Sequence, residues 1–361
     1  MAIYQDTDLA DVIENTQSYF ERRKWVDLSH TNQDYVVTSR IFTGAKFGID
    51  GGLDLRWKVQ KSNTSSYAAS GVGPIINPAH ADHTDGASVA WASANVSSAW
   101  FEEETDWQSG PEKIIDVLAV KQNALYSDIT IGTENALWSS PTSSTQNPRV
   151  PYGIPAWVQK ASTGTSATAT GFNGGDPSWL TTGLAGIDAD VVTTWKNFNG
   201  GYSAVNQTDL LPKLSEAMEK TYFKPPRAYP ELVDAKPNHV LYTTYPVWEA
   251  MQSLQTVSND NLGHDVGKWR STVMFKGVPM SWVPALTNSE SPVRDTQNPI
   301  YGIDWSVLKM FFKKGYDWKT YGPVSPDNQP TVQMVMKIAW YNFRCLSRRQ
   351  LFVFHSTVFG Q

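Results

Sequence analysis

The sequence lacks the features that mark several common classes of protein. Cys345 is its single cysteine, so no disulfide can form within the chain and a disulfide-stapled secreted fold is excluded. No stretch approaches the roughly 20 apolar residues that a membrane-spanning helix needs. The first residues show no basic segment followed by an apolar run, so we expect no signal peptide. We therefore expect a chain made in a reducing cytoplasm, with no membrane partner.

Charge is also scarce. Charged residues make up 18% of the chain, and 30 Lys and Arg against 35 Asp and Glu give a net charge of −5. This balance argues against a protein whose main task is to wrap nucleic acid. Aromatic residues are plentiful, with 15 Trp, 15 Tyr and 14 Phe, and such side chains anchor both cores and interfaces.

Motifs for catalysis are missing as well. The sequence has no Walker A loop, no G-x-G-x-x-G after a strand, no G-x-S-x-G elbow and no C-x-x-C pair. His80 and His83, with Asp82 and Asp85 nearby, are the nearest approach to a metal cluster. The two histidines are spaced i, i+3, and no third ligand follows them at a familiar spacing. A polar loop explains them better, and we predict a protein without enzymatic activity, cofactor or metal.

The most informative segment is a long ribbon of two strands. Residues 46–60 alternate so that one face carries Leu53, Leu55, Trp57 and Val59. A return strand is expected over residues 88–101, which contain Trp91. An isolated two-stranded hairpin is marginal in water, and residues 62–86, rich in Ser, Ala, Gly, Asn and Pro, offer little cover. We predict that another copy of the protein covers this face, and that Trp57→Asp leaves a folded subunit that fails to assemble.

The remaining pattern indicates a mixed α+β chain without βαβ units, internal repeats or a heptad seam. A helix of about 42 Å is predicted over residues 111–138, opened by Ser109 and Pro111, closed before Pro141, and weakest at Gly132. Further helices are expected over residues 8–24, 209–223 and 247–254, strands over 35–42, 239–244, 273–283 and 301–312, and a loop over 316–330. Residues 332–343 and 350–354 are expected to form a closing hairpin.

Two charged clusters are candidates for contacts. Glu102, Glu103 and Glu104 suit a solvated acidic edge, a helix N-terminus or a basic patch on a neighbouring subunit. The basic residues Arg344, Arg348 and Arg349 suit either an ordinary charged turn or a contact with phosphate.

The order of these parts resembles the major capsid proteins of tailed bacteriophages, whose shared Johnson fold was first seen in a Hong Kong phage. Three stretches carry the resemblance: residues 112–118 (EKIIDVL) with 134–138 (ENALW), residues 183–187 (GLAGI) with 194–197 (TWKN), and residues 298–304 (NPIYGID) with 308–310 (LKM) and the closing hairpin.

The resemblance implies a division of the chain. Residues 1–42 would be an N-terminal arm and residues 43–101 an extended E-loop hairpin that lies over a neighbouring subunit. Residues 102–150 and 331–361 would form a peripheral domain with a long spine helix, and residues 151–330 an axial domain. The implied function is a major capsid protein that self-assembles, as hexamers and pentamers, into the icosahedral shell around the double-stranded DNA of a tailed phage.

The implied location is the virion capsid, assembled in the host cytoplasm. Because the arm begins within the first ten residues, we expect a separate scaffolding protein and a portal to set the shell size. Packaged DNA would be contacted without sequence specificity, and a decoration protein is a further candidate partner. Two alternatives stay open: the shell protein of a bacterial nanocompartment, and a Trp-rich carbohydrate-binding or glycan-cleaving protein, which exposed Trp on loops would favour.

Overall fold

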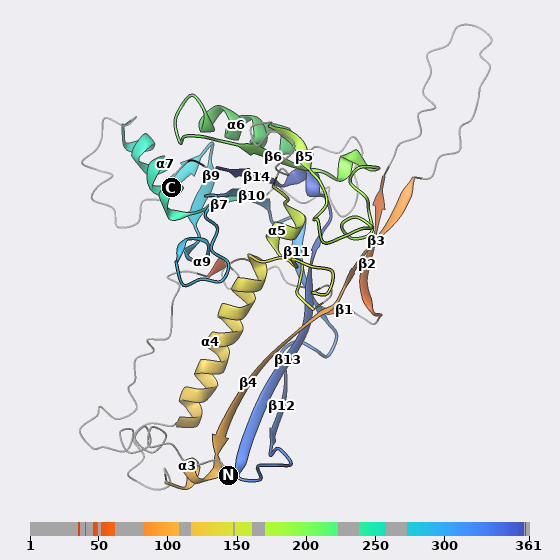
Figure 1. Ribbon diagram of the computed structural model, residues 1–361, viewed down its shortest axis with the longest axis vertical. Helices are drawn as coiled ribbons and strands as arrows, with labels where there is room; N and C mark the ends of the chain where they lie inside the picture. The colour runs from red at the N-terminus through yellow and green to blue at the C-terminus, as the bar shows by residue number, and fades with distance from the viewer. Residues whose placement is uncertain are drawn as a thin grey trace, which may run out of the picture.

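The computed structural model describes residues 35, 36, 40, 46–49, 52–61, 83–107, 117–146, 149–160, 170–222, 238–257, 273–356 and 358. These residues form a five-stranded sheet, a seven-stranded sheet and a separate two-stranded ribbon. Figure 1 shows an elongated molecule in which a long helix and the longest strands extend away from the seven-stranded sheet. The helix expected over residues 8–24 lies outside the described residues, as does most of the strand expected over 35–42.

The five-stranded sheet is built around its longest strand, β13 (Val332–Cys345). One edge of β13 pairs with β11 (Leu308–Lys313) and β12 (Lys319–Val324), and the other pairs with β4 (Ala92–Phe101). The short β1 (Lys46–Ile49) runs parallel to β11 at the border of the sheet. The acidic helix α3 (Glu102–Trp107) follows β4 directly.

Helix α4 (Val117–Leu137) packs along β4, with Lys121 Nζ 3.4 Å from the carbonyl oxygen of Ala99. It is continuous through Gly132, so the predicted weak point is wrong, whereas its end before Pro141 is confirmed. The predicted start lies outside the described residues. The 21 described helical residues give a length of about 32 Å.

The seven-stranded sheet has the order β5-β6-β14-β10-β7-β9-β8. Its strands are β5 (Gly171–Gly174), β6 (Asn197–Gly201), β7 (His239–Thr243), β8 (Val273–Phe275), β9 (Val278–Trp282), β10 (Ile300–Asp304) and β14 (Phe352–His355). Helices α6 (Leu210–Thr221) and α7 (Tyr245–Val257) pack on this sheet and confirm two of the predicted helices. Lys276 and Gly277, with φ of 48° and 78°, form the tight turn between β8 and β9.

Three sequence predictions about the strands after residue 300 are wrong. Residues 332–343 and 350–354 do not form a hairpin, because β13 lies in the five-stranded sheet and β14 lies between β6 and β10. Residues 301–312 form two strands, β10 and β11, in different sheets, and the expected loop over 316–330 contains β12. Alternation identifies a strand but not its partner, so β13 and β14 were predicted as strands without their pairing, and β12 was not predicted.

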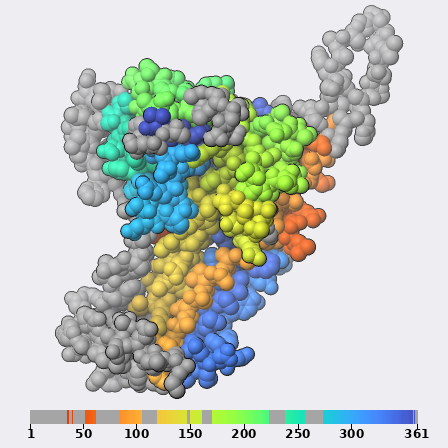
Figure 2. All heavy atoms as spheres, in the orientation of Figure 1, coloured from red at the N-terminus to blue at the C-terminus, as the bar shows by residue number. Residues whose placement is uncertain are grey.

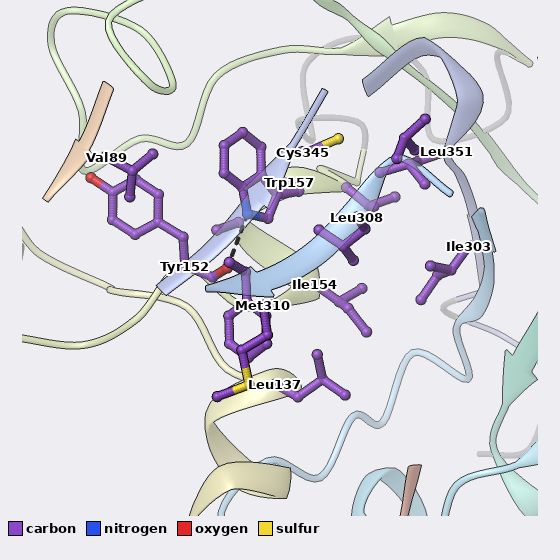
Figure 3. Close-up of a cluster of buried hydrophobic side chains, with 14 of the residues drawn as sticks. Val89, Leu137, Tyr152, Ile154, Trp157, Ile303, Leu308, Met310, Cys345 and Leu351 are labelled. Carbon is purple, nitrogen blue, oxygen red and sulfur yellow. Dashed lines mark hydrogen bonds between the residues drawn. The ribbon is translucent and has the colours of Figure 1, made fainter. Parts of the chain in front are cut away.

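The main hydrophobic core joins the two sheets. Leu137 at the end of α4 and Ile154 and Trp157 of the short helix α5 (Ile154–Trp157) pack in one cluster with Leu308 and Met310 of β11. Figure 3 shows these side chains together, with the Trp157 indole N–H donating to the carbonyl oxygen of Tyr152 at 3.0 Å. The short helices η2 (Thr193–Trp195), α9 (Pro284–Thr287) and η3 (Arg348–Gln350) complete the described elements.

Candidate assembly surfaces

The two-stranded ribbon consists of β2 (Asp54–Gln60) and β3 (Thr84–Ala90), paired antiparallel. Leu55 and Trp57 are buried, with 4% and 9% of their surface exposed, and Trp91 is 6% exposed. The Trp57 ring lies 6.2 Å from the ring of Trp157, between centroids, and Val59 is half-buried against the same core. The prediction that this face has no partner within its own chain is therefore wrong for Leu55, Trp57 and Trp91.

The ribbon is also joined to the five-stranded sheet. Residues 88–101, expected as one return strand, divide at Trp91, so that β3 pairs with β2 and β4 pairs with β13. Only one residue separates β3 from β4. The ribbon is thus a direct extension of the sheet rather than an isolated hairpin.

Of the predicted interface residues on the ribbon, Leu53 alone points into solvent, with 86% of its surface exposed. The acidic residues occupy the first turn of α3, where Glu102 accepts a hydrogen bond from Gln333 at 2.6 Å and Glu104 lies 2.6 Å from the Lys121 ammonium. Glu102 and Glu103 are exposed and Glu104 is half-buried. A contact of Leu53 and the three glutamates with a neighbouring subunit stays a prediction.

Arg348 is fully buried, and the prediction that it faces DNA is wrong. Its guanidinium donates to the carbonyl oxygens of Trp157 at 2.9 Å and Gly175 at 2.7 Å, and it lies 3.3 Å from the Asp176 carboxylate. Burial lowers the pKa of Arg348 to about 10, although the negative charge of Asp176 acts in the opposite direction and raises it. Arg348 therefore ties η3, between the two sheets, to α5 and to the chain near β5.

The other two arginines lie over aromatic rings. The Arg344 guanidinium is 4.4 Å from the Phe311 ring centroid, and that of Arg349 is 4.4 Å from the Phe172 centroid. Both side chains are half-buried. Phosphate contact by Arg344 and Arg349 stays a prediction.

The sequence analysis missed an apolar surface on the five-stranded sheet. Lys337 of β13 lies over the Tyr126 ring of α4 at 3.8 Å, so the odd-numbered residues of this strand face the helix. The opposite side, which we call the open face, carries the apolar residues Val332, Met334, Met336, Ile338 and Trp340, all half-buried. The apolar residue at every second position from 332 to 340 is a signal that could have identified it, although Val335 and Ala339 on the helix side are apolar as well.

Neighbouring strands extend the open face. In the antiparallel register Ser97 lies opposite Met336, and Lys319 lies opposite Ile338, so these residues share one side of the sheet. Tyr321 and Val324 of β12 lie opposite Met336 and Met334, and Val324 is 57% exposed. Figure 2 shows β4 in orange and β12 and β13 in blue side by side at this end of the molecule. An apolar sheet face of this kind is typical of a surface that binds another protein.

Other site types find little support in the described part of the chain. Every Trp whose side chain the structure describes is buried or half-buried. The exposed Trp on loops that would favour carbohydrate binding is therefore not found among them. No group of three or more His, Cys, Asp or Glu there could hold a metal ion, although His80 and Asp82 lie outside the described residues. No described helix is both long enough and apolar enough to cross a membrane.

The single thiol gives a simple check of the core. Cys345 is fully buried, and burial raises its pKa to about 12. Because the thiolate is the reactive form, we expect Cys345 to react with a disulfide reagent at pH 8 more than about a hundredfold more slowly in the native protein than in urea. Absorbance of the released thiol measures both rates. Comparable rates in the two states would contradict the burial of β13.

Comparison with solved structures identifies the fold. The capsid asymmetric unit of cyanophage A-1(L) matches with a TM-score of 0.59 and 10% identity, over 94% of this chain and 97% of that chain. The mature capsid of bacteriophage PhiM1 matches with a TM-score of 0.53 and 11% identity, over 94% and 92%, and the capsid of a native GTA particle with 0.53 and 11%, over 94% of both chains. No family model matches the sequence, and no curated protein is similar to it. The predicted Johnson fold of phage capsid proteins is confirmed.

Proposed function

We propose that this chain is a major capsid protein, which self-assembles into the icosahedral shell of a tailed phage. The observation that carries the proposal is the match over nearly the whole length of both chains to the cyanophage capsid subunit. A binding domain or an enzyme that had borrowed one part of the fold would match over that part alone. The open face supports the proposal independently, because it supplies an apolar surface of the kind that copies of a protein use to associate.

The parts of the fold take the roles that the resemblance implies. Helix α4 is the spine helix, the five-stranded sheet belongs to the peripheral domain, and the seven-stranded sheet with α6 and α7 belongs to the axial domain. Residues 43–101, which include the ribbon, are the proposed E-loop that lies over a neighbouring subunit. The five-stranded sheet also contains β11 and β12, which come from residues 151–330.

The partners follow from the same proposal. Copies form hexamers and pentamers in the virion capsid after synthesis in the host cytoplasm. A scaffolding protein and a portal set the size of the shell, and a decoration protein is a further candidate partner. Packaged double-stranded DNA is contacted without base readout by scattered Lys and Arg, with Arg344 and Arg349 as candidates. Such contacts are weak and decrease as salt rises.

Electron microscopy of the expressed protein, alone and with its phage's scaffolding protein, tests the proposal. Closed shells, tubes or ring-shaped capsomers are expected. A protein that stays monomeric at every concentration and salt would contradict it. Nuclease-protected DNA inside shells made during infection separates a capsid from the alternative, a bacterial nanocompartment, whose shell encloses protein.

Leu53 and Trp57 provide a matched test of the ribbon. Leu53→Asp is expected to leave the free energy of unfolding within about 0.5 kcal/mol of the wild type, because Leu53 is 86% exposed, yet to lower the yield of assembled particles. Trp57→Asp removes a buried ring and is now expected to lower that free energy by about 3–5 kcal/mol. Urea unfolding and sedimentation measure the two effects. Normal particle yield from Leu53→Asp would exclude Leu53 from the contact.

A further inference from the structure

A buried histidine lies at one end of the seven-stranded sheet. His355 is the last residue of β14, and only 5% of its surface is exposed. Its Nδ1 atom is excluded from solvent and has no hydrogen-bond partner. Most buried polar groups in folded proteins are hydrogen-bonded, because an unpaired one destabilises the native state. The surroundings of His355 supply a reason for this exception.

A pair of opposite charges lies beside this histidine. The Ser356 N–H donates to the Gln297 carbonyl oxygen at 2.8 Å, which joins the end of β14 to the loop before β10. The Lys160 ammonium, just after α5, donates to the Asp295 carboxylate at 2.6 Å and to the Gln297 side-chain oxygen at 2.8 Å. The second Asp295 oxygen accepts the Gln297 backbone N–H at 3.0 Å. We call His355, Lys160, Asp295 and Gln297 the His355 corner, and its charges cancel while His355 is neutral.

The His355 corner disfavours a second cation. Burial lowers the pKa of His355 below its ordinary value of 6.5, Lys160 lowers it further, and Asp295 acts in the opposite direction. Tyr202 and Tyr301 also lie near Asp295, but burial and the Asp295 charge raise the pKa of both phenols, so they stay neutral. Protonation of His355 therefore places two cations against one carboxylate in a largely buried site.

We propose that His355 is an acid-sensitive switch in the seven-stranded sheet. In the protonated ring both nitrogens carry N–H groups, so the buried Nδ1 needs an acceptor. Asp295 is the one carboxylate among the described residues that acts on His355. Asp295 then exchanges its contact with Lys160 for one with His355, and the loop before β10 separates from the chain after α5. The sheet is held closed at neutral pH and loosens in acid before the subunit unfolds.

The effect of pH on stability has a definite direction. The unfolded chain binds a proton at His355 near pH 6.5, whereas the folded chain binds it only at lower pH. His355 therefore contributes its full stability above pH 6.5, and that contribution is lost as pH falls from 6.5 toward the lowered pKa. Acid also protonates carboxylates elsewhere, so the contribution is measured as a difference between variants.

Nuclear magnetic resonance of the unassembled full-length subunit, labelled with carbon-13 at histidine, tests the switch directly. The chain has six His, and the signal that is missing from His355→Gln identifies His355. Its measured pKa is expected below 6.5 in the wild type. Lys160→Met is expected to raise that pKa, because a neighbouring cation is removed. If Lys160 only supported the packing, its removal would leave the pKa of His355 unchanged.

Urea unfolding at about pH 7.5 and about pH 5 provides a second readout. Between these two pH values the urea midpoint is expected to fall less in His355→Gln than in the wild type, and by an intermediate amount in Lys160→Met. His239→Gln is the control, because His239 lies opposite Asp304 at the other end of β10. It should keep the pH dependence of the wild type. Lys160→Met retains His355 and so tests the switch even where His355→Gln does not fold.

Hydrogen exchange locates the opening. The Ser356 N–H, which donates to Gln297, is expected to lose protection near pH 5, while the amides of β13 keep theirs. Equal loss of protection in both sheets would show global unfolding rather than a local switch.

The outcomes do not depend on the proposed function, because the unassembled subunit is measured below the concentration at which particles form. A His355 pKa at or above 6.5, or one that Lys160→Met does not move, overturns the inference and leaves the capsid function standing. An equal acid-induced loss in the wild type and in His355→Gln overturns it as well.

Discussion

Met336→Asp is expected to give a folded subunit whose assembled fraction falls by more than about tenfold. Met336 lies at the centre of the open face, with Ser97 on one side and Tyr321 on the other. An aspartate there is solvated in the free subunit, but covering it in a contact between copies leaves a carboxylate desolvated without a partner. That desolvation costs several kcal/mol, and 1.4 kcal/mol already changes an association constant tenfold.

Thr320→Asp is the matched control for Met336→Asp. Thr320 lies on β12 next to Tyr321 but pairs with Lys337, so it shares the side of the sheet that α4 covers, and it is exposed. Sedimentation velocity gives the assembled fraction, and far-UV circular dichroism checks that both variants are folded. Equal loss of assembly in the two variants would show that added negative charge, rather than the open face, is responsible.

Arg348→Met is expected to lower the free energy of unfolding of the unassembled subunit by about 3–5 kcal/mol. The change removes the cation from a buried pair and leaves Asp176 and the carbonyl oxygens of Trp157 and Gly175 without its donors. Asp176 keeps the backbone N–H groups of Leu184 and Ala189, at 3.1 and 2.7 Å, which limits the loss.

Arg349→Met is the control for this prediction, because it removes the same charge one residue away from a half-buried side chain over Phe172. Its expected effect is below about 1 kcal/mol. Urea unfolding is measured below the concentration at which particles form, since association with other copies raises apparent stability. A loss below about 1 kcal/mol for Arg348→Met would show that the two sheets are held together without this residue.

Local patterns in the sequence predicted local structure well. The stop before Pro141 ended α4, and the apolar spacing over residues 209–223 predicted α6. Each depends on residues within one or two turns of chain. Gly132 is the exception, because packing of α4 on β4 overrides a weak intrinsic preference.

Contacts between distant segments could not be predicted in this way. The ring that packs against Trp57 belongs to Trp157, in a helix of four residues that carries no periodicity. Arg348 has the sequence context of an exposed basic turn, and only the fold places the Gly175 and Trp157 carbonyl oxygens around it. The fold class followed from the order of the parts, whereas the burial of individual site residues depends on what the tertiary structure brings against them.

The pairing of β4 with β13 has a consequence for how the subunit is made. Glu102 and Gln333, which meet at the far end of this pair, are 231 residues apart in the sequence. At a synthesis rate of about 5–20 residues per second, β4 leaves the ribosome roughly 10 to 50 seconds before its partner exists. During that interval its edge is open, and ribosomes on one message hold several such edges close together. Correct pairing within each chain therefore has to compete with pairing between nascent neighbours, and conditions that slow translation are expected to increase insoluble product.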